Sequence, residues 1–128
     1  MLKNFLALIY RRFIVAGRHS SKGLKDAFHK EEAFRFQVIL SVFLIPLAWF
    51  IANSYQQLLM LLMALFLVMI VELLNTAIEI VVDRIGPEVH KLSGRAKDIG
   101  SAAVALSMSL FVLVWGLISA ANFGIITS

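Results

Sequence analysis

The chain has 128 residues, of which 60% are hydrophobic and 16% charged, so it is too apolar for an ordinary soluble domain, where about a quarter of the residues are charged. Its length allows a single domain, 1–128, and the absence of cysteine excludes disulfide bonds and thiolate metal sites. The net charge of +4 does not indicate nucleic-acid binding, because the basic residues flank apolar segments instead of forming a soluble basic surface.

The N-terminal residues predict an amphipathic helix at a membrane surface. Polar residues lie on one helical face, and apolar side chains recur on the opposite face. The apolar residues are Leu2, Phe5, Leu6, Ile9 and Phe13. MLKNFLALIYRRF is not a signal peptide, since its apolar run before Arg11 is short and no small-residue cleavage site follows. We expect surface helices over residues 2–33, and a plain membrane anchor is the simplest role for the first of them.

The second part of this region, SSKGLKDAFHKEEAFRF, places a carboxylate among apolar residues. On a helical wheel Leu24, Ala27 and Phe28 share a face with Glu31. This pattern predicts that Glu31 points into the bundle or towards a partner cation. The simpler alternative is a surface ion pair between Glu31 and Arg35, which are four residues apart.

Three membrane spans are predicted next. A span needs about 20 mostly apolar residues. Residues 36–71 and 99–128 contain no charged residue, and we place spans near 36–53, 57–82 and 99–122. All twelve Lys and Arg residues lie before the first span or in the segment 84–97. By the positive-inside rule, the N-terminus and the 84–97 loop are expected in the cytoplasm and the C-terminus outside.

Four polar residues interrupt the second span, in VMIVELLNTAIEIVVDRIG. Glu72, Asn75, Glu79 and Asp83 are spaced so that they spread over only about 80° of a helical wheel. Charged groups inside a span are costly and usually face a cavity or the bundle interior at a functional site. Interhelical hydrogen bonding without further function is the alternative.

The depths of these carboxylates suggest two roles. Glu79 and Glu31 could supply oxygen ligands to a hard cation such as Mg²⁺ at the membrane surface. Glu72 lies about 10 Å deeper in the helix, where a carboxylate could act as a general base towards a hydroxyl.

The following segment, HKLSGRAKDIGS, could complete a phosphate site. Lys97 and Arg95 could hold phosphates, and Asp98 could help to bind metal. No P-loop or kinase-type glycine-rich loop is present in the sequence. Spacing alone therefore predicts a metal and phosphate site at a membrane surface, without naming the reaction.

The motif ELLNTAIEIVVD at 72–83 resembles the signature E-x-x-N-[ST]-x-x-E-x-x-x-D of the prokaryotic diacylglycerol kinase family. The similarity extends through DRIG at 83–86, HKLSGRAKDIGSAAV at 90–104 and SSKGLKDAF…EEAFR at 20–35, and covers about half the chain. The resemblance implies an all-α integral membrane fold, with three transmembrane helices and an N-terminal amphipathic surface helix in a homotrimeric bundle. Active sites would be shared between subunits.

The resemblance also implies an activity and a location. The γ-phosphoryl group of MgATP would be transferred to the hydroxyl of diacylglycerol, giving phosphatidic acid for phospholipid recycling, in the bacterial inner membrane. Glu72 would take the hydroxyl proton and Asn75 would help to hold that centre, while Glu31 and Glu79 would bind the Mg²⁺ ion. Implied nucleotide-binding residues are Arg12, His19, Glu31, Glu79, Asp83, Glu88, His90, Lys97 and Asp98. Implied lipid-binding residues are Arg12, Ser20, Arg35, Glu72, Ser101 and Trp115.

Two alternatives remain open from the sequence. The residues F-x-F at 34–36 are similar to the undecaprenol kinase branch, whereas DRIG and LSGRAKD favour the diacylglycerol branch. A non-enzyme alternative is a holin-like pore or a small transporter subunit. The polar stripe formed by Glu72, Asn75, Glu79 and Asp83 would then line an ion path. The phosphate-holding residues Lys97 and Asp98 at the same membrane face argue against it.

Overall fold

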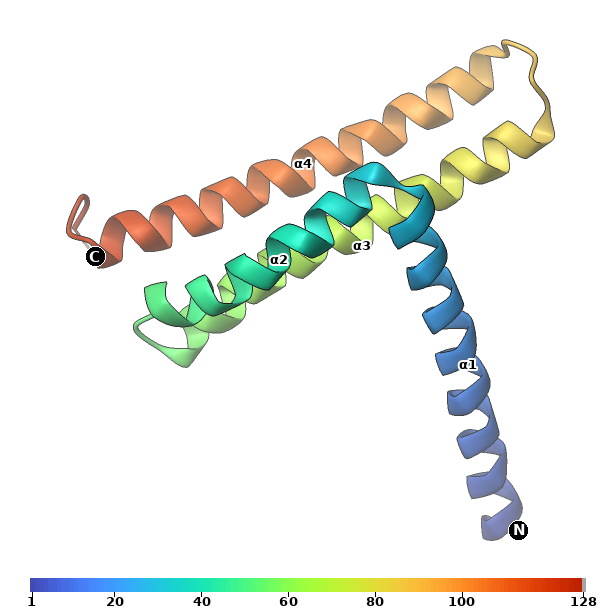
Figure 1. The fold of residues 1–128 in the computed structure, drawn as a ribbon, viewed down its shortest axis with the longest axis horizontal. Helices are drawn as coiled ribbons and strands as arrows, with labels where there is room; N and C mark the ends of the chain where they lie inside the picture. Colours follow the sequence, from blue (N-terminus) through green and yellow to red (C-terminus); the bar gives the residue numbers. More distant parts are fainter. Residues whose placement is uncertain (128) are drawn as a thin grey trace.

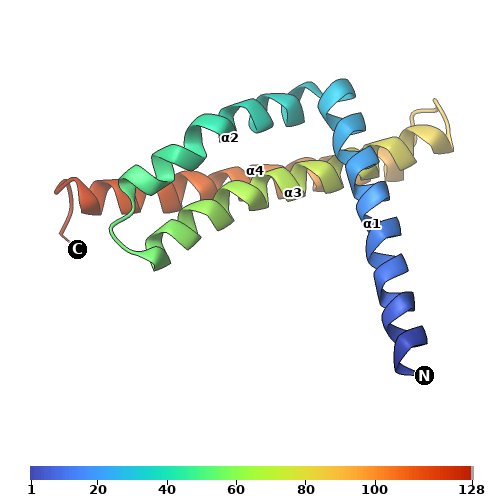
Figure 2. The same ribbon diagram turned by 60° about the horizontal axis from the view of Figure 1, so that its bottom comes forward.

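The computed structural model describes residues 1–127, and it is entirely helical apart from short connections. Four helices follow one another along the chain: α1 (Leu2–Lys30), α2 (Glu32–Ile51), α3 (Tyr55–Ile85) and α4 (Lys91–Asn122). Figure 1 shows α2, α3 and α4 as a bundle and α1 leaving it at a steep angle. The turned view in Figure 2 shows the same arrangement.

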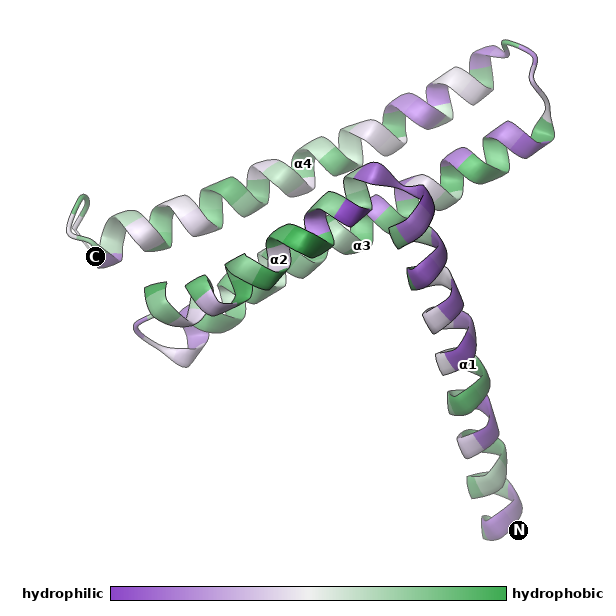
Figure 3. Cartoon of the chain, in the orientation of Figure 1, coloured by the Kyte–Doolittle hydropathy of each residue, from purple (hydrophilic) through white to green (hydrophobic). Residues whose placement is uncertain are grey.

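Three of the helices can cross a membrane. By length and composition, α2, α3 and α4 each qualify as a membrane span, which confirms the predicted number of spans. Their outward side chains are apolar, including Phe43 and Phe50, which are 68% and 77% exposed in the single chain. Figure 3 shows hydrophobic residues along the bundle, and hydrophilic residues on α1 and at the α3–α4 turn.

The joint between α1 and α2 corrects a detail of the sequence analysis. We expected Glu31 to share a helical face with Leu24, Ala27 and Phe28, but α1 ends at Lys30 and Glu31 is extended, with φ −105° and ψ 108°. The guanidinium of Arg35 donates to the carbonyl oxygens of Phe28 and His29 at 3.3 and 3.1 Å. It thus satisfies carbonyls that the end of α1 leaves without helical partners. The contacts of Arg35 given by the structure are these carbonyls, and the alternative of an ion pair with Glu31 is not observed among the described residues.

The connection between α3 and α4 is shorter than expected. Residues 84–97 were predicted to be a loop, but only residues 86–90 are non-helical, because α3 continues to Ile85 and α4 begins at Lys91. Hydropathy marks where a helix leaves the membrane, not where it ends. With 31 and 32 residues, α3 and α4 are much longer than α2, which has 20, so their ends project beyond α2 as a helix pair (Figure 1).

The core lies at the opposite end of the bundle, near the α2–α3 turn. Ala48, Leu61 and Trp115 are buried there, from α2, α3 and α4 respectively. The indole Nε1 of Trp115 donates to the carbonyl oxygen of Leu61 at 3.0 Å. Asn122, at the end of α4, donates to the carbonyl oxygen of Ile51 at 2.8 Å. These contacts hold the three spans together far from the charged residues.

Candidate functional site

The predicted polar stripe runs along α3 from the middle of the bundle to the projecting helix pair. In chain order Glu72 is half-buried, Asn75 is buried, Glu79 is half-buried and Asp83 is exposed. Helical spacing alone places them on neighbouring turns. Each of the four has a polar contact, and these contacts connect α3 to both of the other spans.

Glu72 is the deepest carboxylate of the stripe. Its Oε2 accepts a hydrogen bond from Nε2 of Gln37 on α2, at 3.4 Å. The neighbours Leu73 and Leu74 on α3 are apolar. Glu72 therefore offers a half-buried carboxylate oxygen between α2 and α3, among apolar neighbours in the sequence.

Asn75 lies one turn beyond Glu72 in the stripe and contacts Glu79. Its Nδ2 donates to Oε1 of Glu79 at 3.3 Å, one turn away on α3. Its Oδ1 is buried, has no hydrogen-bond partner among residues 1–127, and lies against Gly100 of α4. A β-carbon on Gly100 would come within 2.3 Å of this oxygen, so only glycine leaves room for Asn75 in this position.

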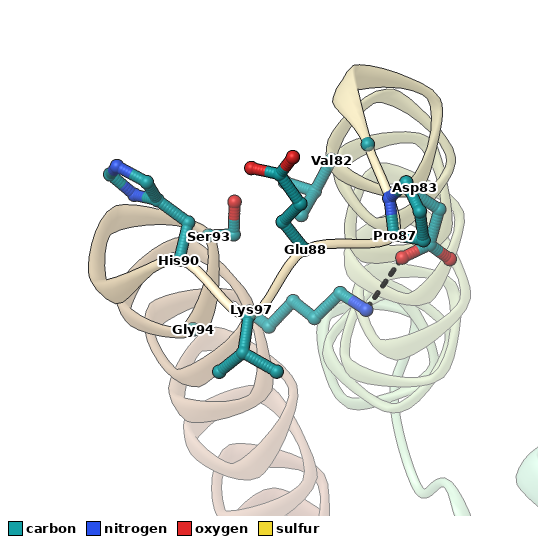
Figure 4. Close-up of a pocket in the computed structure, with 10 residues that line it drawn as sticks. Val82, Asp83, Pro87, Glu88, His90, Ser93, Gly94 and Lys97 are labelled. Atoms are coloured by element: carbon teal, nitrogen blue, oxygen red, sulfur yellow. Dashed lines mark hydrogen bonds and ion pairs between the residues drawn. The ribbon is translucent and has the colours of Figure 1, made fainter.

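A cavity of about 490 Å³ lies where α3 turns into α4 (Figure 4). Nζ of Lys97 contacts Oδ1 of Asp83 across it at 2.6 Å, and both side chains are substantially exposed. This pair is one of two ion pairs among the described residues; the other joins Lys30 to Asp26 on α1 at 2.7 Å. The hydrogen bond from Lys30 to the Asp26 carboxylate raises the pKa of Lys30.

This cavity gathers four of the predicted nucleotide-binding residues. Its lining includes Asp83, Glu88, His90 and Lys97. The side chain of His90 also caps α4, since its Nδ1 accepts from the backbone nitrogen of Leu92 at 3.1 Å. Lys97 and His90 lie beside two segments that contain glycine, 86–90 and 93–94. Together they form a surface suited to phosphate groups.

Other predicted site residues lie elsewhere in the single chain. Arg12 and His19 line a shallow hollow on α1 that shares no lining residue with the Lys97 cavity. Ser20 and Ser101 are exposed on α1 and α4. Trp115 lies in the core near the α2–α3 turn, far along α4 from the cavity. Glu31 lies at the α1–α2 joint, and Asp98 is exposed on α4 outside the cavity lining.

No single chain assembles a complete metal cage in the described residues 1–127, where no three acidic or histidine side chains converge. The carboxylates that the sequence analysis assigned to metal are both half-buried, Glu31 at the joint between α1 and α2 and Glu79 on α3. Mg²⁺ usually binds proteins through one or two carboxylates, with phosphate oxygens and water completing its shell. The residues present are therefore compatible with a Mg²⁺ ion that arrives with a nucleotide.

Sequence reasoning missed two residues that contact the stripe. Gln37 contacts Glu72 from a position 35 residues earlier, and Gly100 contacts Asn75 from 25 residues later. Helical spacing finds neighbours within one helix only. A wheel of α2 would have aligned Gln37 with the buried residues Phe34 and Ser41, which is the one signal that could have marked it.

Comparison with known proteins identifies the family. A family model described as prokaryotic diacylglycerol kinase matches residues 18–119. The diacylglycerol kinase of Haemophilus influenzae is 48% identical over 99 residues, which cover 77% of this chain and 84% of that protein. That of Escherichia coli K12 is 44% identical over 116 residues, 90% of this chain and 94% of that protein. That of Pseudomonas aeruginosa is 41% identical over 108 residues, 84% and 88% respectively. The chain belongs to the prokaryotic diacylglycerol kinase family.

Proposed function

We propose that this kinase transfers the γ-phosphoryl group of ATP to the free hydroxyl of diacylglycerol, giving phosphatidic acid and ADP. The family and the names of its relatives support diacylglycerol as the acceptor, and they favour neither undecaprenol nor a pore or transporter function. The observation that carries the proposal is the α3 stripe, which leads from the exposed Lys97 cavity to a carboxylate inside the apolar bundle. A water-soluble donor and a membrane-bound acceptor need such an arrangement.

On the acceptor side, Glu72 acts as the general base. As the lipid hydroxyl oxygen forms its bond to the γ-phosphorus, Glu72 takes the hydroxyl proton. The bond between the γ-phosphorus and the β–γ bridging oxygen breaks, and its electron pair leaves with ADP. Asn75 donates to Glu79 and holds that carboxylate in place beside the acceptor site.

On the donor side, Lys97 and His90 bind the nucleotide phosphates from the cavity at the α3–α4 turn. Nζ of Lys97 lies 2.6 Å from Oδ1 of Asp83, and a phosphate oxygen of ATP replaces that carboxylate as its partner. The pairing keeps the ammonium group pointed into the cavity. Glu88, Asp98, Arg12 and His19 are the further nucleotide-binding candidates.

Mg²⁺ is the metal that this donor set fits, with Glu31 and Glu79 as its protein ligands. When bound, it neutralises charge on the nucleotide phosphates during phosphoryl transfer. Arg35 supports Glu31 indirectly, because its bonds to Phe28 and His29 carbonyls hold the α1–α2 joint in shape.

The enzyme works as a homotrimer in the bacterial inner membrane, with α1 on its cytoplasmic surface and the C-terminus outside. Two features support this placement of α1. It lies across the direction of the spans (Figure 2). Its apolar residue Ile9 also falls five helical turns from Ala27, which is buried, so both point to the same side. Ser20, Arg35, Ser101 and Trp115 remain candidates for lipid contact.

A phosphorylation assay tests the function directly. Purified protein in mixed micelles with MgATP should phosphorylate diacylglycerol faster than undecaprenol. If folded protein phosphorylates neither lipid, the proposed lipid kinase function is wrong. If undecaprenol is the better substrate, the proposal of diacylglycerol as the acceptor is wrong.

The role of Glu72 has its own test. Glu72→Gln should lower kcat by at least about 100-fold, because an amide cannot accept the hydroxyl proton. Binding of MgATP, measured by equilibrium titration, should change by less than about twofold. Loss of nucleotide binding together with turnover would assign Glu72 to metal or to folding instead.

A further inference from the structure

Gln37 on α2 is the polar partner that the structure gives to the deep carboxylate of α3. Its Nε2 donates to Oε2 of Glu72 at 3.4 Å, and the residue is only 8% exposed. Within residues 1–127, Glu72 makes no other side-chain hydrogen bond and no ion pair. The orientation of this carboxylate in the single chain therefore depends on one amide.

The oxygen atom of the Gln37 amide has no hydrogen-bond partner among the described residues. Oε1 of Gln37 is buried and accepts no hydrogen bond from the described residues. Gln37 also lines an apolar groove of about 300 Å³, beside Leu40, Leu44 and Met69. A buried polar atom without a partner is unfavourable and rare in native structures. Packing does not explain a glutamine here, because leucine or methionine would fill the same space without that cost.

We infer that Gln37 is a positioning residue for phosphoryl transfer: it holds the Glu72 carboxylate in the orientation needed to take the acceptor proton. This inference rests on the proposed role of Glu72 as the base. Gln37 lies at the contact between α2 and α3. The first span, α2, thus contributes to catalysis through the side chain of Gln37 as well as to the packing of the bundle.

An amide suits this task. It has no titratable proton, so Nε2 donates to Glu72 at every working pH. Its hydrogen bond occupies Oε2 of Glu72 and leaves Oε1 for the acceptor hydroxyl. Fixing one oxygen in this way reduces the rotamers open to the carboxylate, and a misplacement of about 1 Å at a reacting group can cost about 100-fold in rate.

Two variants with opposite properties test the inference in the full-length protein. Gln37→Met keeps the length and volume of the side chain but removes the donor, and kcat for diacylglycerol should fall by about tenfold or more. KM for MgATP and for diacylglycerol should stay within about twofold. Gln37→Glu should keep most of kcat, because two adjacent carboxyl groups share a proton that can form the same hydrogen bond.

A purely structural role predicts the reverse order. In a packing site methionine is tolerated and a buried carboxyl group is not, so higher activity of Gln37→Met than of Gln37→Glu overturns the inference. Ser41→Ala is the matched control: Ser41 is buried on the same helix, its hydroxyl donates to the carbonyl oxygen of Val38 at 2.6 Å, and kcat should be unchanged. If Gln37→Met does not fold, Gln37→Asn replaces it, since its shorter amide does not reach Glu72 and should lose rate similarly.

A second measurement asks whether Gln37 acts through Glu72. Glu72→Asp shortens the carboxylate and breaks the contact, so adding Gln37→Met to it should lower kcat by less than about twofold further. A full tenfold further loss would show that Gln37 acts independently, against the inference. The proposed function fails separately, if Glu72→Gln retains its turnover, whereas wild-type kcat in Gln37→Met overturns only the role of Gln37.

Discussion

At the level of single residues, the stripe depends on how closely α4 approaches α3. Asn75 is buried between Glu79, which accepts from its Nδ2, and the backbone of α4 at Gly100. Small residues at helix contacts allow this closeness in membrane bundles. Because Gly100 has no side chain, the amide of Asn75 has room to lie against α4. In this position it donates to Glu79 and fixes that carboxylate.

The variant Gly100→Ala tests this arrangement. Its methyl group would lie 2.3 Å from Oδ1 of Asn75, so the amide must move away from Glu79. We expect a loss of about 1–3 kcal/mol in unfolding free energy, measured by thermal unfolding in detergent, and a fall in kcat. Gly116→Ala on the same helix is the control, because a β-carbon there meets nothing within 4 Å. Equal effects of the two changes would contradict a specific contact with Asn75.

The sequence predicts the site residues within one helix better than those between helices. Glu72, Asn75, Glu79 and Asp83 follow from helical spacing, because side chains on neighbouring turns of one helix must lie on one side. The contact of Gln37 with Glu72 depends on how α2 and α3 are aligned, and no local pattern records that alignment. For the same reason the cavity that joins Asp83 to Lys97 becomes visible only in the folded chain.

At the level of helices, the number of spans follows from the charge-free stretches, whereas the helix ends do not. The break at Glu31 lies in the sequence HKEEAF, which has neither glycine nor proline to mark it. The end of α1 is instead marked by a contact from the next helix. Arg35 of α2, which runs in a new direction, donates to the carbonyl oxygens of Phe28 and His29. The start of α4 at Lys91 is local instead, because Nδ1 of His90 accepts from the backbone nitrogen of Leu92 and caps the helix.

The contacts of Asn122 predict a change in stability without a change in chemistry. Its Nδ2 donates to the carbonyl oxygen of Ile51 and to Oε1 of Gln57, both at 2.8 Å, which joins the ends of all three spans. Asn122→Leu removes both bonds and leaves the carbonyl oxygen of Ile51 without this donor, while Oε1 of Gln57 still accepts from the backbone nitrogen of Asn53, so the unfolding free energy should fall by about 1–3 kcal/mol.

Activity is the second readout for this variant. The kcat of Asn122→Leu, measured below its unfolding temperature, should match the wild type, because Asn122 lies at the end of the bundle opposite the Lys97 cavity. Asn53→Ala is the control, since Asn53 contacts Gln57 through its backbone nitrogen, which this change retains. A large loss of kcat in Asn122→Leu with unchanged stability would contradict a structural role.

At the level of the whole molecule, the proposed nucleotide-binding residues form two separate groups in one chain. Lys97, His90, Glu88 and Asp83 line the cavity at the α3–α4 turn, whereas Arg12 and His19 lie on α1 beyond the bundle. Many large apolar side chains are also exposed on the spans of the single chain. Both observations fit an assembly in which α1 of one subunit reaches the cavity of another.

Subunit mixing tests this assembly. Arg12→Gln and Lys97→Gln should each be nearly inactive alone. If one site takes Arg12 from one subunit and Lys97 from its neighbour, co-expression of the two variants with different affinity tags and tandem purification should restore about a third of the wild-type sites, one in each mixed trimer. Chains purified separately and then mixed, without exchange of subunits, are the control and should stay inactive. If both residues of a site came from the same chain, no mixed trimer would contain an intact site, and activity would remain absent in the co-expressed sample as well.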